Sequence, residues 1–255
     1  MHPIIISFKL FSRELTIGTY GLLMVTAIFT AIFLAWFRGK RTGQDGSEIF
    51  DALILIACGG VAGALVTGFL IFLPERISYG FFTYPPVLVS WGGILGGALV
   101  LFILKKRWDI DLPFYADLLA PSYLIGIAIG RIGCHFAGCC FGVHSDGPLA
   151  LHFTNSLAPA SSAFQPLVPT QLISAAVLIT GGILAIMIAP TFKVKGNLLF
   201  VSLIFYGAFR FTIEFWRADT RAFIGPFSDG QLFSMAAAAA GIIGILINKR
   251  LRASQ

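Results

Sequence analysis

Charged residues are scarce in this chain. Asp, Glu, Lys and Arg make up 12% of its 255 residues, whereas 57% are hydrophobic and 25 are Phe. Soluble domains contain roughly a quarter charged residues, and a single soluble core has no room for so much apolar surface. The composition therefore excludes an ordinary soluble domain and predicts a protein embedded in a bilayer.

Low-complexity linkers and internal repeats are also missing from the sequence, which excludes a repeat array or a string of tethered modules. We expect a single integral membrane domain over residues 1–255. The first apolar run, residues 17–37, lacks a small-residue cleavage site. We therefore interpret it as a retained span and not as a signal peptide.

Seven apolar runs have the length of a membrane span, which is about 20 residues for roughly 30 Å of hydrocarbon. We predict an all-α, polytopic membrane helix bundle of about seven transmembrane helices. The predicted spans are residues 17–37, 49–73, 85–104, 118–134, 171–190, 197–216 and 231–247.

Basic residues lie mainly on one side of these predicted spans. Eleven of the 18 Lys and Arg residues follow the first, third, fifth and seventh runs, and five lie on the other side. Because cytoplasmic loops carry the excess of Lys and Arg, we expect the N terminus outside and the C terminus inside. This basic collar accounts for most of the net charge of +6, so we expect no nucleic-acid partner.

The sixth predicted span contains charges at helical spacing. Arg210, Glu214 and Arg217 occupy positions i, i+4 and i+7, which places them on one face of a helix. An intramembrane Arg costs about 2.5–3.5 kcal/mol on insertion scales, so it usually faces a polar interior and has a partner. One interpretation is a structural pair of Arg210 with Glu214, and Arg217 alone also has the position of an interfacial residue.

Arg131, at the outer end of the fourth predicted span, supports a functional interpretation. Together with Arg210 it would form a cationic pocket that opens toward the outer leaflet. The planar guanidinium group pairs well with phosphate, and a pocket in this place would meet a phospholipid head group. Taken alone, Arg131 is also compatible with a helix-end residue that extends to the interface.

The longest predicted loop, near residues 134–169, lies on the predicted outer side and contains neither Lys nor Arg. Long loops in compact proteins are often functional, so we expect it to cover or gate the outer face. His135 and His144 lie in it and are candidates for a general base, because His titrates near neutral pH. Each is equally compatible with an ordinary loop or interfacial residue.

Three of the four Cys residues occur in the stretch GRIGCHFAGCCFG. Cys134, Cys139 and Cys140 lack the paired C-x-x-C spacing of structural zinc sites, which disfavours a metal site. An outward-facing disulfide and small thiols packed in the core stay open as interpretations, and packing in the core is also expected for Cys58.

Six short motifs occur in the order typical of one enzyme family, and they cover nearly the whole chain. The motifs are YGLLM at Tyr20, GGILGG at Gly92, GRIG at Gly130, PTQL at Pro169, YGAFRFTIEFWRAD at Tyr206 and DGQLFS at Asp229. On these motifs the chain resembles bacterial prolipoprotein diacylglyceryl transferase. The resemblance implies a multi-pass enzyme of the bacterial cytoplasmic (inner) membrane that acts in lipoprotein biosynthesis.

The implied reaction moves the diacylglyceryl group of phosphatidylglycerol to the lipobox cysteine thiol of a preprolipoprotein. A thioether forms and glycerol phosphate is released. The implied partners are therefore phosphatidylglycerol, the lipobox segment and the membrane. The resemblance implies no metal ion and no diffusible cofactor.

The resemblance and the charge pattern together give a set of expected site residues. Arg131 and Arg210 are expected to hold the phosphate and to stabilise charge on its leaving oxygen, and Glu214 is expected to orient Arg210. The expected catalytic residues are Arg131, Arg210, Glu214 and His135, and the expected substrate-binding residues are Tyr20, Gly92, Gly93, Gly142, Gln171 and Arg217.

Four positions depart from the usual motifs of this family. Trp91 stands where a His often precedes the paired glycines, and Cys134, Ala137 and Cys139 replace two Asn and a Glu of the central block. Because Trp cannot accept a proton, the usual proton-handling groups are missing. Two alternatives therefore stay open: a diverged enzyme that uses the same phospholipid pocket with another acceptor, and a non-catalytic protein that binds lipid or senses redox state.

Overall fold

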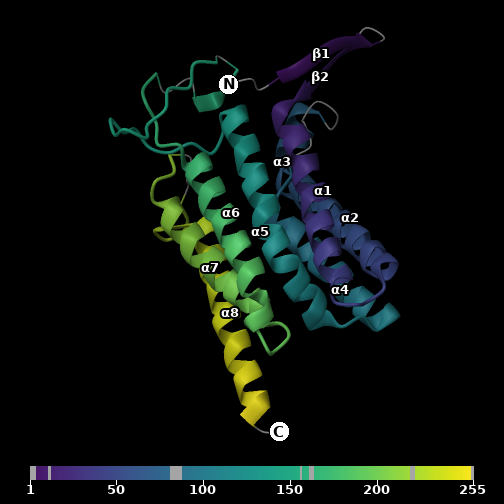
Figure 1. Ribbon diagram of the computed structural model, residues 1–255. Helices are drawn as coiled ribbons and strands as arrows, with labels where there is room; N and C mark the ends of the chain where they lie inside the picture. Colours follow the sequence, from purple (N-terminus) through teal and green to yellow (C-terminus); the bar gives the residue numbers. More distant parts are fainter. Residues whose placement is uncertain are drawn as a thin grey trace. The chain divides into compact units, whose positions relative to one another are not determined.

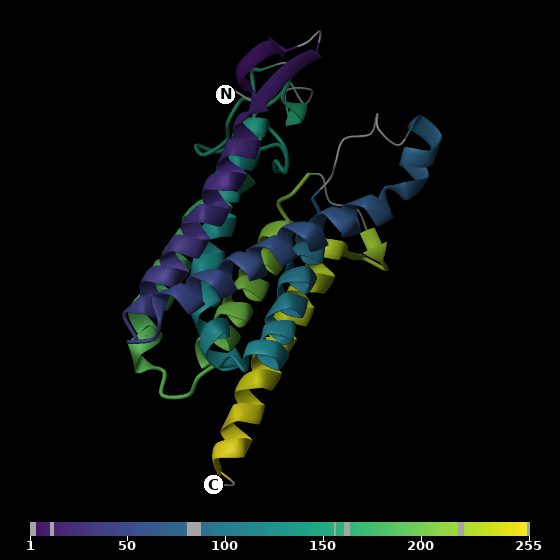
Figure 2. The same ribbon diagram turned by 90° about the vertical axis from the view of Figure 1, so that its right-hand side faces the viewer.

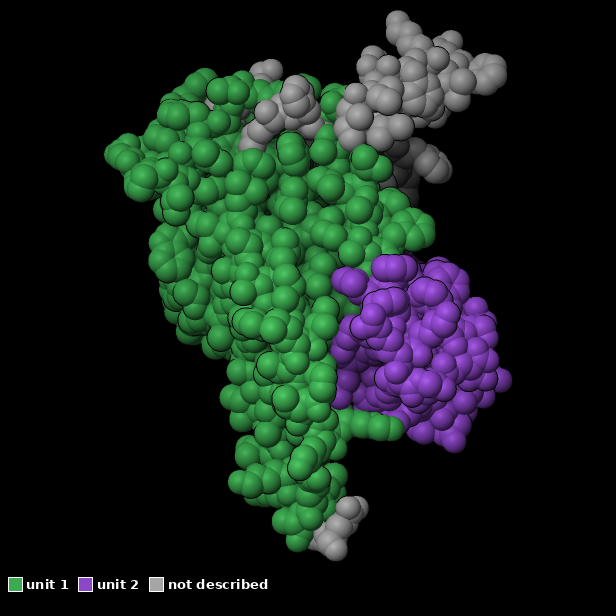
Figure 3. Space-filling model, in the orientation of Figure 1, with its two compact units in different colours: residues 1–31, 119–255 green, residues 32–118 purple. Residues whose placement is uncertain are grey.

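The chain forms two compact units, which Figure 3 shows in different colours. Unit 1 comprises Met1–Ala31 and Leu119–Gln255, and unit 2 comprises Ile32–Leu118. Both are built mainly from long helices (Figures 1 and 2). The computed structural model describes residues 4–10, 13–80, 88–155, 157–160, 164–218 and 222–253.

Short segments join most of the helices, and a long loop joins α5 to α6. Two small antiparallel hairpins pair β1 with β2 before α1 and β3 with β4 between α7 and α8. Unit 2 holds the end of α1, then α2 (Gly46–Ile71), α3 (Leu73–Tyr79), α4 (Ser90–Trp108) and the start of α5. Unit 1 holds β1 (Ile4–Leu10), β2 (Arg13–Gly18), the first part of α1 (Thr19–Lys40), most of α5 (Leu112–Ala137), α6 (Thr170–Ile188), η2 (Ala189–Thr191), α7 (Asn197–Glu214), β3 (Ala222–Ile224), β4 (Phe227–Ser228) and α8 (Asp229–Ala253).

The predicted all-α membrane bundle is confirmed, and the chain is a multi-pass membrane protein. Among the described residues, six helices are long and apolar enough to cross a membrane, namely α1, α2, α5, α6 with η2, α7 and α8. The third predicted span corresponds to α4, which begins at Ser90 and has three basic residues in its last turn. Residues 85–87 of that span lie outside the described part, so the count of seven and the orientation stay predictions.

Local sequence signals explain where several helices begin and end. The Ser47 N–H donates a 2.8 Å hydrogen bond to the Asp45 carboxylate in front of α2, and this bond lowers the pKa of Asp45. Gly196 precedes α7 with a φ of 90°, a conformation that glycine adopts without steric cost. Asp109 is the C-cap residue of α4 and has a φ of 52°.

A hydrophobic core joins the three helices of unit 1 that carry the candidate site. Leu124 and Ala128 of α5 are buried against Leu178 of α6. Phe205 and Phe209 of α7 pack against the same cluster. The core therefore fixes α7 beside α5 and α6, and Figure 1 shows α6 and α7 side by side.

The connection between α5 and α6 has a small core of its own. Phe153, Ala160 and Leu167 are buried together, and Phe141 packs against them. The backbone of Leu151 and Leu167 exchanges hydrogen bonds of 2.9 and 3.0 Å. The described part of this long loop is therefore packed around its own small core. That the loop gates the outer face stays a prediction.

Close contact between α7 and α8 depends on a glycine, and this gives a stability prediction. A Cβ at Gly207 would lie 2.5 Å from the Ser234 carbonyl oxygen and 3.0 Å from the Ala238 Cβ. Because a backbone carbonyl cannot move aside cheaply, Gly207→Val should destabilise the protein by about 1–3 kcal/mol. Thermal unfolding in detergent checks this. The control Gly21→Val places a side chain where no atom lies within 4 Å, and equal losses for both variants would contradict the packing argument.

Candidate active site

A buried carboxylate with three polar partners forms the centre of the charged cluster in unit 1. Glu214 is the last residue of α7, and its side chain is 3% exposed. The Arg210 guanidinium donates a hydrogen bond to Glu214 Oε2, and Ser228 Oγ donates to Oε1 over 2.9 Å. Arg217 Nη1 lies 3.7 Å from Oε2. The expected contact of Arg210 with Glu214 is therefore present, and it is part of a larger network.

Helix α7 ends at Glu214, so Arg217 is not part of it. Only Arg210 and Glu214 therefore lie on one face of the helix, whereas all three residues were expected there. Backbone pairing holds Arg217 in place instead. Gly142 and Arg217 form an antiparallel β-bridge, and the Val143 N–H donates to the Trp216 carbonyl over 2.9 Å. The loop after α5 thus positions the guanidinium group of Arg217 beside Glu214.

Gly142 is packed between two backbone segments, which gives a second stability prediction. Its N–H donates to the Val168 carbonyl over 2.9 Å, and a Cβ would lie 2.6 Å from that oxygen and 2.8 Å from the Trp216 oxygen. Gly142→Ala should therefore lower the free energy of unfolding by about 1–3 kcal/mol, measured by thermal unfolding. The matched control is Gly147→Ala in the same loop, whose Cβ meets only the Ser145 hydroxyl, at 3.2 Å. An unchanged melting temperature for Gly142→Ala would contradict this role.

Sequence reasoning missed Ser228 and Gly230, which complete the environment of Glu214. Ser228 Oγ accepts a 3.1 Å bond from the Gln231 N–H, and the Gln231 side chain accepts a 3.1 Å bond from the Ser228 N–H. This reciprocal pair is a capping box at the start of α8. A Cβ at Gly230 would lie 2.6 Å from Glu214 Oε1 and 2.8 Å from Arg210 Nη2. The pattern S-x-x-Q before an apolar run was the available signal.

Arg131 brings a further positive charge from α5. Within the described part of the chain it has no hydrogen-bond or ion-pair partner, and it interacts electrostatically with Arg210, Cys140 and Tyr20. Tyr20 lies in the first turn of α1, where its Cδ2 atom is 3.3 Å from the place of a Cβ on Gly133. Three guanidinium groups against one carboxylate leave two positive charges in excess, so the cluster is suited to an anion.

The cysteines of the central block converge beside this cluster. The sulfur atoms of Cys134, Cys139 and Cys140 all lie within 4.8 Å of one another, and they are free thiols. Hydrogen bonds with the other two thiols, followed by the charges of Arg217 and then Arg131, lower the pKa of the Cys140 thiol. Cys58, on α2, is exposed, so the expectation that it packs in the core is wrong.

The first turn of α6 holds the cysteine turn by two side-chain hydrogen bonds. Thr170 Oγ1 donates to the Cys140 carbonyl and Gln171 Nε2 donates to the Cys139 carbonyl, each over 2.7 Å. The Gln171 side chain is fully buried, and its Oε1 atom has no hydrogen-bond partner among the described residues. Gln171 therefore positions the cysteine turn, and contact with a substrate stays a prediction.

The two candidate bases differ in their surroundings. The His135 ring makes edge contacts with Phe136 and Phe153, at centroid distances of 5.8 and 5.9 Å. Its buried Nδ1 atom has no hydrogen-bond partner in the described part of the chain. His144 Nδ1 lies 3.0 Å from the Pro166 carbonyl, and its side chain is 42% exposed. Only His135 shares a helix with Arg131, and its role as a base stays a prediction.

Gly92 and Gly93 belong to unit 2, at the crossing of α4 with α2. A Cβ at Gly92 would contact the Thr67 side chain and lie 2.7 Å from the Gly63 carbonyl oxygen, and one at Gly93 would lie 3.3 Å from the Gly60 oxygen. Both positions thus allow close approach of the two helix backbones. Their expected part in substrate binding stays a prediction.

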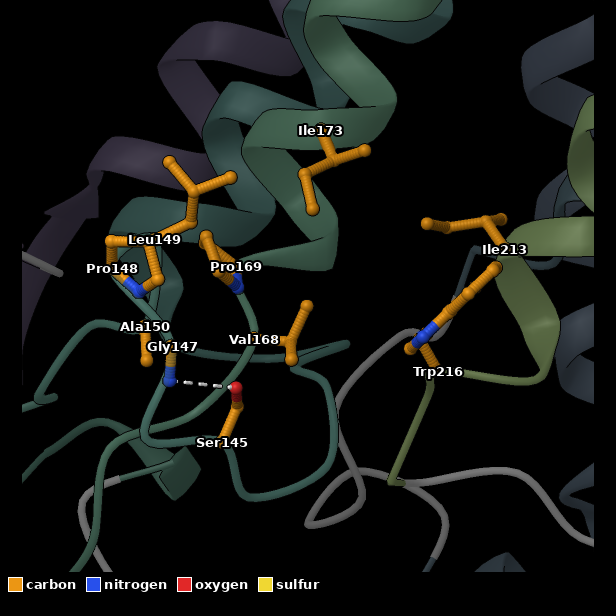
Figure 4. A pocket seen from close by; sticks show the side chains of 10 residues that line it. All are labelled: Ser145, Gly147, Pro148, Leu149, Ala150, Val168, Pro169, Ile173, Ile213 and Trp216. Carbon is orange, nitrogen blue, oxygen red and sulfur yellow. Dashed lines mark hydrogen bonds between the residues drawn. The ribbon is translucent and has the colours of Figure 1, made fainter.

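An apolar cavity of about 400 Å³ lies in unit 1, next to Trp216 at the end of α7. Figure 4 shows its walls, which come from residues 145 and 147–150 of the loop, Val168 and Pro169 before α6, Ile173 of α6, and Ile213 and Trp216 at the end of α7. The Gly147 N–H donates to Ser145 Oγ over 3.1 Å within this wall. The lining is suited to a hydrocarbon group and not to a charged one.

Comparison with known proteins identifies relatives over nearly the whole chain. The model of the family described as prolipoprotein diacylglyceryl transferase matches residues 6–247. Phosphatidylglycerol–prolipoprotein diacylglyceryl transferase 2 of Clostridium perfringens is 32% identical over 243 residues, which are 92% of each protein. Similarly named transferases of Clostridium tetani and Geobacter sulfurreducens are 29% and 28% identical over 98% and 91% of both chains. The family match includes every residue of the charged cluster.

Proposed function

The chain belongs to the prolipoprotein diacylglyceryl transferase family, and on this premise we propose that it transfers the diacylglyceryl group of phosphatidylglycerol to the lipobox cysteine thiol of preprolipoproteins. One observation carries the mechanism: Arg210 and Arg217 contact the buried Glu214, Arg131 acts electrostatically on Arg210, and the four side chains leave two positive charges in excess. This cluster is the proposed phosphate site.

The charge of the cluster fits the chemistry of this reaction. The acceptor thiolate attacks the glycerol carbon, the new carbon–sulfur bond forms, and the carbon–oxygen bond to phosphate breaks. The phosphate starts as a diester with a single negative charge and leaves as a monoester that carries about −1.5 to −2 at pH 7. A site with two excess positive charges stabilises the developing charge more than the ground state, which is the requirement for catalysis.

Each side chain of the cluster has a distinct proposed role. Arg131 has no hydrogen-bond or ion-pair partner among the described residues, and it binds the phosphate oxygens together with Arg210. Glu214 orients Arg210 and Arg217, and it is fixed in turn by Ser228. Tyr20, Gly142 and Gln171 shape the surroundings, and His135 is the proposed proton acceptor for the lipobox thiol.

We further propose that the protein is a single integral domain of the bacterial inner membrane, with the N terminus outside and the long loop between α5 and α6 on the periplasmic side. The excess of basic residues after the first, third, fifth and seventh predicted spans supports this orientation. The apolar cavity beside Trp216 suits an acyl chain of the lipid.

Complementation tests the proposed function in cells. Cells depleted of their own essential transferase should grow when they express the wild-type chain, but not when they express Arg131→Ala or Arg210→Ala. Membrane levels of each variant are compared by immunoblot. Equal growth with both variants would remove the charged cluster from the mechanism, and no growth with well-expressed wild type would contradict the function.

A further inference from the structure

Three thiols in unit 1 have an arrangement that the proposed function does not use. The Cys134, Cys139 and Cys140 sulfur atoms are within 4.8 Å of one another. Three sulfur atoms bound to one zinc ion at about 2.3 Å lie roughly 4 Å apart. A small inward shift of side chains therefore satisfies three metal–sulfur bonds, whereas a disulfide joins only two sulfurs, at about 2.05 Å.

The backbone holds these thiols together from outside the cluster. Gly138 and Cys140 have φ angles of 69° and 59°, and such a conformation is uncommon for a residue with a side chain. Thr170 and Gln171 hold the same turn through the carbonyl oxygens of Cys140 and Cys139. Four independent features thus bend the chain so that Cys139 and Cys140 face Cys134 on the preceding helix, and such preorganisation favours ion binding.

The surrounding charge also suits a thiolate-rich complex. Three thiolates and a divalent ion leave a net negative charge, and a fourth thiolate increases it. The positive charges of Arg217 and Arg131 both act on Cys140. The soft sulfur donors select thiophilic ions of the zinc type over magnesium or calcium.

We propose that Cys134, Cys139 and Cys140 bind a zinc ion through three thiolates, and that the open fourth position binds the thiol of the acceptor cysteine. Three protein ligands with one open position are typical of catalytic zinc sites. A thiol that coordinates zinc gives up its proton, here to His135 as the proposed proton acceptor, so the acceptor cysteine is held as a zinc-bound thiolate beside the phosphate site. This second part rests on the proposed transferase function, and the first part does not.

The inference accounts for a departure found in the sequence. Trp91 cannot accept a proton, and Cys134 and Cys139 replace polar residues of the usual motif. Zinc coordination would supply the deprotonation that these changes remove. In the transfer step the acceptor sulfur forms its bond to the glycerol carbon, glycerol phosphate departs with the electron pair of the broken carbon–oxygen bond, and the neutral thioether leaves the zinc ion.

Metal analysis of the purified full-length protein in detergent tests the binding. The wild type, loaded with zinc under reducing conditions and desalted, should keep a single zinc ion per chain by mass spectrometry of the metal. Cys139→Ser should lose it, and Cys58→Ser, which alters the cysteine in unit 2, should keep it. Zinc retained by Cys139→Ser, or wild type without zinc, would overturn the proposal.

Alkylation of the wild type gives a test that needs no variant. With zinc bound, the three clustered thiols should be protected from a maleimide, and a chelator should expose them. Reaction of the three clustered thiols with zinc present would overturn the site, as would a disulfide seen as the loss of two hydrogen masses.

Activity separates the two parts of the proposal. Chelation should abolish diacylglyceryl transfer, and added zinc should restore it. Full activity of the metal-free protein would overturn the catalytic role of zinc and leave the transferase function standing. A protein that binds zinc but transfers no lipid would contradict the transferase function and the assigned role of the ion.

Discussion

Arg131→Ala is expected to lower the turnover number of diacylglyceryl transfer by about 10²–10³-fold without lowering the melting temperature. Arg131 has no hydrogen-bond or ion-pair partner among the described residues, so its removal leaves no buried group unpaired. It also removes repulsion with Arg210. The loss of activity then reports the interaction with the phosphate group of the substrate.

Two further variants sharpen this prediction. Arg131→Lys keeps the charge but loses the planar fork of the guanidinium group, so it should restore only part of the activity. Arg107→Ala removes an exposed Arg at the end of α4 and should leave turnover unchanged. The assigned role of Arg131 would be contradicted by near wild-type turnover in Arg131→Ala at saturating phosphatidylglycerol.

Glu214→Ala is expected to abolish activity and also to destabilise the protein, in contrast to Arg131→Ala. Its carboxylate is buried and accepts contacts from Arg210, Arg217 and Ser228. Removing one partner of a buried ion pair costs about 3–5 kcal/mol, because the remaining charge is left uncompensated. Thermal unfolding and transfer assays on the same preparations check both effects.

A double-mutant cycle isolates the pair. If Arg210 and Glu214 act as one unit, Arg210→Ala combined with Glu214→Ala should be less destabilising than the sum of the single changes, with a coupling of about 0.5–3 kcal/mol. Glu214→Gln is the conservative control, because an amide keeps an acceptor for Ser228 but loses the charge. Additive losses in the cycle would show that the two residues act independently.

The long helices were predictable because apolar length alone decides whether a segment can cross a bilayer. The contact of Arg210 with Glu214 was equally accessible, since the i, i+4 spacing on a helix fixes it. The end of α7 at Glu214 could not be predicted, because the residues that follow continue the sequence pattern of the helix. Arg217 reaches the cluster through backbone pairing with Gly142, a contact between distant parts of the chain.

The central block was harder to interpret for a different reason. The spacing of Cys134, Cys139 and Cys140 contains no paired motif, so the sequence did not indicate that the three thiols converge. Their convergence requires left-handed backbone at Gly138 and Cys140. Thr170 stabilises that turn from the start of the next helix, and no local pattern indicates it. The capping box at Ser228 was visible in the sequence, but its second function, a hydrogen bond to Glu214, depends on tertiary packing.

The most direct measurement is the mass of a lipobox peptide after incubation with the purified protein and vesicles of phosphatidylglycerol. The peptide should gain a diacylglyceryl group on its cysteine, and glycerol phosphate should appear in equal amount. Both products should form about 10²–10³-fold more slowly with Arg131→Ala. Lipid cleavage without a change in peptide mass, or equal modification by the variant, would contradict an arginine cluster that drives transfer to a thiol.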